Sequence, residues 1–248
     1  MRHISLLLIF FFFACADSRA QNSRSAQAYF NRAIQRYAKG DLKGAIEDFE
    51  IAIKFDPNLA LAYLYRANAR KATGDIDAAI ADYCRAIELN AHLAQAYNNR
   101  GNAWMDRGDI DRAILDFDKA IEIDPRLALA HNNRGSARLE KKDLDGAMAD
   151  FDRAIALDRR LSLAYHNRGT LWIIKGDPSK AIPDFGKAID LNSRYASAYL
   201  KRGIAWLLQG KAAEAQKDFD QCLKIDSSLR ARVEESVKKT RQQLGLEQ

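Results

Sequence analysis

Proline, cysteine and histidine are all scarce in this sequence. Its 248 residues include 4 Pro, 3 Cys, 4 His and 13 Gly, whereas 48% of them are hydrophobic. So few prolines and glycines disfavour short strands with tight hairpins and favour helices, and the apolar content excludes a disordered chain. No His is followed four residues later by a second His or Cys, as a zinc pair carried by one helix requires. We therefore expect no metal site and no cofactor.

A block of one charge sign is also missing. The 39 basic and 33 acidic residues are spread along the whole sequence and leave a net charge of +6. Nucleic-acid binding needs positive charge clustered on one face, so we expect no nucleic-acid partner. The sequence also lacks a Gly-rich phosphate loop, a nucleophile elbow and a pair of catalytic carboxylates outside its periodic pattern. These absences predict that the protein is not an enzyme.

The N-terminus carries one long apolar run, Ile4–Phe13, between a positively charged start and several small residues. This order is typical of a secretory signal peptide, and the run is shorter than the ~20 residues that a membrane span needs. We expect residues 1–20 to contain this signal peptide, with cleavage after Ala16 or Ala20, and the protein to be exported to a bacterial periplasm or secreted. The alternative is lipidation of Cys15, which would anchor the chain to the envelope and is the only route by which we expect a membrane association.

A 34-residue repeat fills most of the remaining sequence. Six in-phase copies cover residues 26–229 with no insertion between them. The copies are residues 26–59, 60–93, 94–127, 128–161, 162–195 and 196–229. Within each copy, position 8 is Ala or Gly, position 20 is Ala, position 24 is Phe or Tyr, and position 27 is Ala or Cys. Spacings of three and four residues place these positions on one face of two successive helices.

Small residues at positions 8 and 20 let the two helices approach, and the aromatic residue at position 24 fills the space beside them. A Gly-Asp turn joins the helices in four copies, with Gly at the helix exit and Asp as the next N-cap. Lys142 replaces this Gly in the fourth copy, and Lys211 replaces this Asp in the sixth. A single hairpin cannot bury its apolar faces, so the hairpins must stack.

This pattern resembles the tetratricopeptide repeat. The resemblance implies an all-α fold, a right-handed α-solenoid of helix-turn-helix hairpins with a concave groove for a protein or peptide. Residues 230–248 follow the last copy and carry an apolar stripe of Val233, Val237 and Leu244 at helical spacing. We expect them to form the C-terminal capping helix and tail that such arrays need.

Every copy has Arg at position 7 and Asp at position 23, which an antiparallel hairpin brings together. The pairs are Arg32 and Asp48, Arg66 and Asp82, Arg100 and Asp116, Arg134 and Asp150, Arg168 and Asp184, and Arg202 and Asp218. We expect each Arg to bind the Asp of its own repeat and to fix the hairpin register. The remaining cysteines, Cys84 and Cys222, lie four repeats apart, and we expect no disulfide between them. Cys222 occupies the small position 27 and should be buried.

The resemblance also implies which side chains face the groove, through positions 2, 5, 6, 9, 12 and 13 of the first helices. We expect the partner-binding residues to be Asn98, Asn99, Asn102, Asn132, Asn133, Ser136, His166, Asn167 and Thr170. Asn donates and accepts hydrogen bonds, so a row of Asn can pair with a peptide backbone. The position-6 residues Asn99, Asn133 and Asn167 could equally bond within the scaffold.

Together these features predict an exported interaction scaffold or adaptor that binds a peptide segment or partner protein in its groove. The alternative is a lipid-anchored component of a bacterial outer-membrane assembly complex. An RNA-binding helical-hairpin array is a third hypothesis, and the regular 34-residue period, the export signal and the dispersed charge count against it.

Overall fold

The computed structural model describes residues 21–245, and all of their regular structure is helical. The chain divides after Ile123 into two compact units, each of which is described by itself. The expected signal peptide, residues 1–20, and the lipidation candidate Cys15 lie outside the described residues. The expected all-α solenoid of helical hairpins is confirmed in both units.

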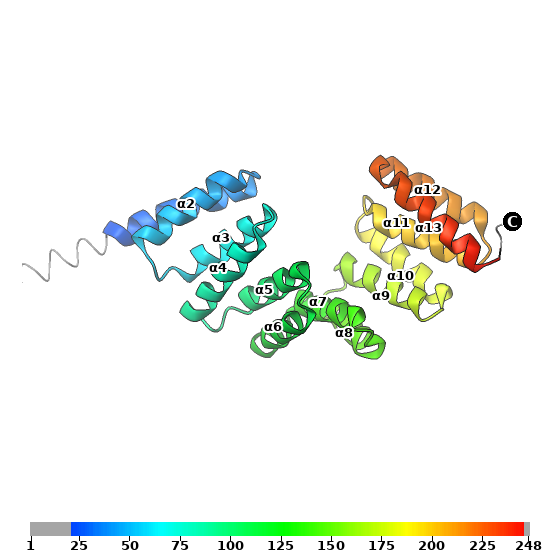
Figure 1. Cartoon of the computed structure of the whole chain (residues 1–248), viewed down its shortest axis with the longest axis horizontal. Helices are drawn as coiled ribbons and strands as arrows, with labels where there is room; N and C mark the ends of the chain where they lie inside the picture. Colours follow the sequence, from blue (N-terminus) through cyan, green and yellow to red (C-terminus); the bar gives the residue numbers. More distant parts are fainter. Residues whose placement is uncertain (1–20, 246–248) are drawn as a thin grey trace, which may run out of the picture. The chain divides into compact units, whose positions relative to one another are not determined.

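Unit 1 consists of three antiparallel helix pairs, shown in blue to green in Figure 1. Its helices are residues 21–38, α2 (Leu42–Phe55), α3 (Ala60–Ala72), α4 (Ile76–Leu89), α5 (Ala94–Arg107) and α6 (Ile110–Ile123). Successive helices from α2 to α6 pack against each other, and α3 also contacts α5. The first helices of consecutive repeats therefore lie side by side and form one face of the unit.

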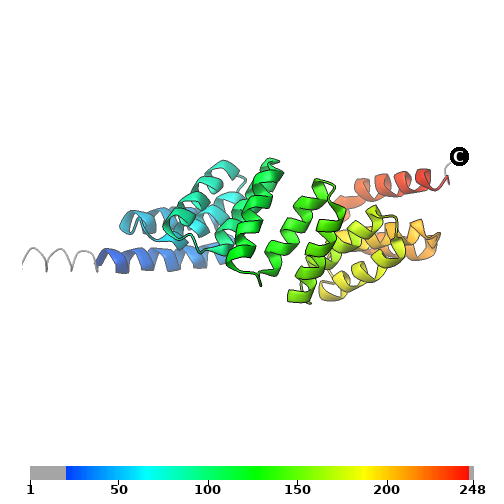
Figure 2. The ribbon, with the colours of Figure 1, turned by 90° about the horizontal axis from the view of Figure 1, so that it is seen from below.

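Unit 2 repeats this arrangement and closes with an additional helix. Its helices are α7 (Ala128–Glu140), α8 (Leu144–Leu157), α9 (Ser162–Ile174), α10 (Pro178–Leu191), α11 (Ala196–Leu208), α12 (Ala212–Ile225), the 3-10 turn η1 (Ser227–Leu229) and α13 (Arg230–Gln243). The first helices α7, α9 and α11 contact one another in that order, and α13 packs against α11. Figure 2 shows α13, in red, as a separate helix after the last hairpin.

The turns within the hairpins explain where the helices end. Gly108 and its counterparts adopt φ values of 74° to 88°, the left-handed conformation that glycine tolerates best. Lys142 takes the same conformation with φ 63°, and among residues 21–245 it is the one non-Gly residue with a positive φ. Asp41, Asp75, Asp143 and Asp177 accept hydrogen bonds from the first turns of the helices that follow. Lys211 makes no such cap bond.

The core of each hairpin is formed by the periodic small and aromatic residues. Phe49, Tyr83, Phe117, Phe151, Phe185 and Phe219 are all buried. A Cβ added to Gly101 would lie 2.6 Å from the ring of Phe117, which shows how closely the helices approach. Cys222 is buried as expected, Cys84 is half-buried, and both are free cysteines.

Candidate functional site

The six Arg–Asp pairs are present as expected, each within one repeat. In all six, Nε and Nη2 of Arg donate to the two carboxylate oxygens of Asp, with Nη2–Oδ1 distances of 2.5–2.7 Å. The six Asp residues are at most 6% exposed. The hydrogen bond from Arg32 lowers the pKa of Asp48 despite its burial. These pairs fix the hairpins and leave no open carboxylate for a ligand.

We call the six pairs the Arg–Asp ladder. Beside it, position 11 of the repeat holds one of two residue types. In three repeats it is an Arg whose Nη1 approaches the same Asp: Arg36 to Asp48 at 3.3 Å, Arg70 to Asp82 at 2.9 Å and Arg138 to Asp150 at 2.9 Å. In the other three it is a Trp with a cation over its ring: Arg112 over Trp104, Lys180 over Trp172 and Lys211 over Trp206. Both residue types at position 11 therefore contact a charged side chain, Arg through an ion pair and Trp through its ring.

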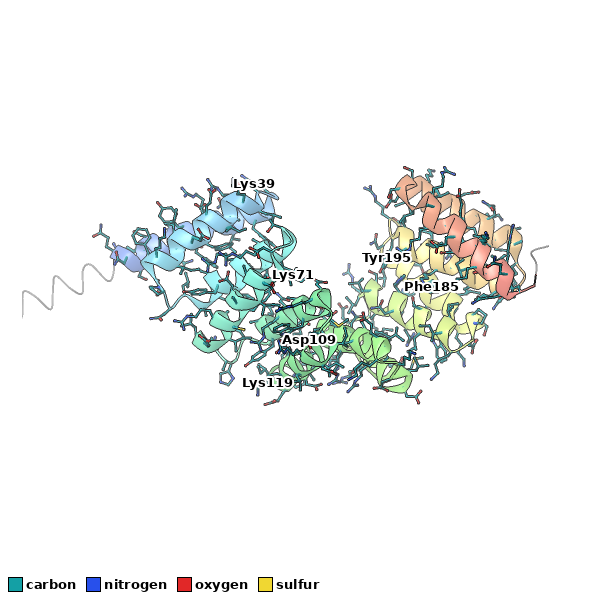
Figure 3. The ribbon with its side chains drawn as sticks, viewed as in Figure 1. Lys39, Lys71, Asp109, Lys119, Phe185 and Tyr195 are labelled. Carbon is teal, nitrogen blue, oxygen red and sulfur yellow. The ribbon has the colours of Figure 1, made fainter. Side chains whose placement is uncertain are left out.

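In unit 1 the first-helix face carries a polar pocket of about 360 Å³, which we call the amide pocket. It is lined by Tyr37, Asn68, Lys71, Ala72, Tyr83, Asn99 and Asn102. Of the three candidates in this unit, Asn99 and Asn102 line the pocket, whereas Asn98 is 5% exposed and donates to Oδ1 of Asn99. Lys71, labelled in Figure 3, forms an ion pair with Asp106 at 2.6 Å.

Asn68 connects two other residues of the amide pocket, and it is not among the candidates predicted from the sequence. Its Oδ1 accepts from the Tyr83 hydroxyl at 2.7 Å and from Nδ2 of Asn99 at 2.9 Å. Asn99 is therefore a scaffold residue that links α3 to α5. The signal that could have found Asn68 is Tyr83, since position 24 is Phe in the other five repeats and a buried hydroxyl requires a partner.

In unit 2 most of the candidate side chains bond within the scaffold. Nδ2 of Asn167 donates to Oδ1 of Asn132 at 3.0 Å and to Oγ of Ser136 at 3.2 Å, which ties α9 to α7. Asn132 is 3% exposed and donates to Oδ1 of Asn133. Ser136 donates to the Asn132 carbonyl of its own helix, and the Thr170 hydroxyl donates likewise to the His166 carbonyl.

His166 lies inside an aromatic cluster rather than at an open surface. Its ring centroid is 5.6 Å from that of Phe185 and 4.8 Å from that of Tyr195, both labelled in Figure 3. Nδ1 of His166 is buried and has no hydrogen-bond partner among residues 21–245. Burial, followed by the charges of Lys201 and Arg232, lowers the pKa of His166 to about 4. His166 is therefore neutral at physiological pH.

Unit 2 also contains an open groove of about 680 Å³, which we call the C-terminal groove. It is lined by Ile173, Ile174, Gly176, Pro178, Lys201, Ile204, Leu208, Ser236, Lys239, Thr240 and Gln243. These residues come from α9, α11 and α13, from the turn between α9 and α10, and from the start of α10. None of the six candidates of unit 2 lines this groove. The groove could not be predicted from the repeat because four of its eleven lining residues belong to α13.

Two further properties bear on what the chain can bind. Within residues 21–245 no group of three His, Cys, Asp or Glu side chains is placed to hold a metal ion. No helix in this part of the chain is long and apolar enough to cross a membrane.

Comparison with known families identifies the repeat. Models of the tetratricopeptide repeat match residues 94–127, 128–160 and 175–228, and a further TPR repeat model matches residues 35–74 and 67–106. The chain therefore belongs to the tetratricopeptide-repeat family. A search of curated proteins found no match.

Solved structures of similar fold include several bacterial repeat proteins. A crystal structure of MamA protein is 26% identical and covers 68% of this chain and 93% of its own, with a TM-score of 0.56. The type IV pilus biogenesis factor PilW is 21% identical over 84% of this chain and 96% of its own, with a TM-score of 0.75. YrrB, described as a TPR protein with an unusual peptide-binding site, is 21% identical over 77% of this chain and 97% of its own, with a TM-score of 0.56.

Proposed function

We propose that this protein is an exported interaction scaffold that binds a peptide segment or partner protein through the first helices of its units. The observation that carries the proposal is that the first helices of each unit line an open site, the amide pocket in unit 1 and the C-terminal groove in unit 2. Side chains such as Asn102 and Ile174 line them without a role in the core. YrrB, which has a similar fold and is described as having an unusual peptide-binding site, supports the same use of the fold.

The proposal includes the absence of catalysis. Every buried carboxylate of the ladder is paired with Arg, and the ladder positions recur in each repeat, as expected for a framework. Proteins of this family act as scaffolds, and the side chains of the two open sites are mainly amides, tyrosines, hydroxyl groups of Ser and Thr, aliphatic groups and lysines. Such groups bind and orient a partner, which is the role that we assign to them.

Two exposed apolar residues provide a matched test. Ile174 is 53% exposed on the first helix α9, and Leu115 is 67% exposed on the second helix α6. The mature chain, tagged and used to capture partners from an envelope extract, should lose its partner with Ile174→Glu and keep it with Leu115→Glu. Equal loss with the two variants, or loss with Leu115→Glu alone, would contradict the proposal.

Export is proposed on the N-terminal sequence alone. Mass spectrometry of the mature protein should show that residues 1–16 or 1–20 have been removed, and retention of Met1 in exported material would contradict this. The alternative function, a lipid-anchored component of an outer-membrane assembly complex, is favoured by Cys15 following Ala14. A diacylglyceryl group on Cys15 would establish that alternative.

A further inference from the structure

We propose that the C-terminal groove is selective for a segment that carries an acidic side chain beside apolar ones, with the carboxylate held near Lys201 and Lys239. This inference rests on the proposed function, since it specifies the partner of the same face. It concerns unit 2 only.

The wall of the C-terminal groove is largely apolar on the side formed by α9 and α11. Ile173 and Ile174 of α9 face it together with Ile204 and Leu208 of α11. Ile174 is 53% exposed, although most large apolar side chains of unit 2 are buried or half-buried. Covering this surface with apolar side chains of a partner would remove it from water, which favours binding.

Lys201 provides a positive charge in the C-terminal groove. It is half-buried on α11 and makes no ion pair with any carboxylate among the described residues. The other half-buried lysines are paired: Lys71 with Asp106 at 2.6 Å and Lys119 with Glu122 at 2.7 Å. A partly desolvated ammonium without a counter-charge is unfavourable, and a carboxylate from a partner would relieve it.

The residues around Lys201 do not supply a negative charge to balance its ammonium group. The groove is lined by Lys201 and Lys239 but by no Asp or Glu. Burial, and then the nearby guanidinium of Arg232, lower the pKa of Lys201. The groove therefore contains two lysines and no acid, and Arg232 of α13 adds a further positive charge near Lys201. An acidic, apolar segment matches both features, whereas a neutral apolar segment would leave the charge uncompensated.

The test uses a displayed library of random twelve-residue peptides selected against the mature chain. Enriched sequences should contain Glu or Asp next to Leu, Ile, Val or Phe. An enriched peptide should bind at least tenfold more tightly than the same peptide with Gln in place of its acid. Selection without an excess of acidic residues, or no enrichment at all, would overturn the inference.

Variants locate the effect in the groove. Lys201→Gln should remove the preference for the acid while the Gln peptide binds as before, and Ile174→Ser should weaken both peptides. Lys39→Gln, a change at an exposed turn of unit 1, serves as the control and should change neither. Thermal unfolding of Lys201→Gln should match or exceed that of the parent, because the variant loses an unpaired charge. A preference for the acid that survives Lys201→Gln would contradict the assignment.

A membrane surface is the competing explanation for basic and apolar side chains together. Binding of the mature chain to vesicles of anionic phosphatidylglycerol that depends on Lys201, without any peptide preference, would replace the inference. If the peptide selection fails while the capture test still separates Ile174→Glu from Leu115→Glu, the inference is wrong and the proposed function stands.

Discussion

The amide pocket of unit 1 and the C-terminal groove of unit 2 are built from the same repeat but differ in chemistry. The amide pocket is lined by Asn and Tyr side chains, and its lysine, Lys71, is paired with Asp106. The C-terminal groove has Ile and Leu in its wall, and the half-buried one of its two lysines, Lys201, has no acidic partner among the described residues. The scaffold positions are constant, so a few substitutions on the first helices are enough to change what each face can bind.

The largest expected effect concerns the Arg–Asp pairs, which both units contain. Asp116→Ala in unit 1 and Asp184→Ala in unit 2 each leave an Arg without the carboxylate that it binds through two hydrogen bonds. Each should lower the free energy of unfolding by ~3–5 kcal/mol, measured by urea denaturation. Asp190→Ala, on the exposed surface of α10, is the control and should have little effect. A loss in one unit only would show that the ladder is not a common framework.

The second expected effect is that the stability of unit 2 depends on pH through His166. The pKa of His166 is about 4 in the folded protein and 6.5 without the protein environment, because burial disfavours the charged ring. The unfolded chain therefore binds the proton first, and stability should fall as the pH drops from 6.5 towards 4. We expect unit 2 to lose about 2 kcal/mol between pH 7 and pH 5.

Urea denaturation at the two pH values checks this expectation. His166→Gln should abolish most of the loss, whereas His92→Gln, in an exposed loop of unit 1, should leave it in place. The same pH dependence in the His166→Gln variant would show that another group is responsible.

A smaller effect concerns the amide pocket alone. Tyr83→Phe removes the hydroxyl that donates to Oδ1 of Asn68 and should lower the stability of unit 1 by about 1 kcal/mol. Combining it with Asn68→Ala should cost less than the sum of the two single changes, since the two residues share one hydrogen bond. Additive costs would show that the bond contributes nothing.

The smallest expected effect is an increase in the stability of unit 2 when Lys142 is replaced by Gly. Lys142 adopts a left-handed φ of 63° at a turn where other repeats have Gly. Lys142→Gly should therefore stabilise unit 2 by up to about 1 kcal/mol. Gln209→Gly is the matched control, because φ is −90° at that position in the equivalent turn of the sixth repeat. A destabilised Lys142→Gly variant would mean that its side chain makes a contribution that outweighs the backbone strain.

The sequence was sufficient for the fold and for the Arg–Asp ladder because both depend on local spacing repeated six times. It was not sufficient for the binding face. Asn99 and Asn167 could equally face the groove or the scaffold, and only the contacts between neighbouring first helices show that both amides donate to the preceding repeat. Lys201 and Ile174 became candidates only once α13 was placed against α11, a tertiary contact that the repeat does not encode.

The most direct test of the account is to map where a partner touches the chain. A photo-crosslinking residue would be placed at Asn102 in the amide pocket, at Ile174 in the C-terminal groove, and at Leu115 and Ala149 on exposed surfaces of the second helices α6 and α8. The account predicts adducts with the captured partner from Asn102, Ile174 or both, and none from Leu115 or Ala149. Adducts formed mainly from Leu115 or Ala149 would contradict the claim that the first-helix face is the binding surface.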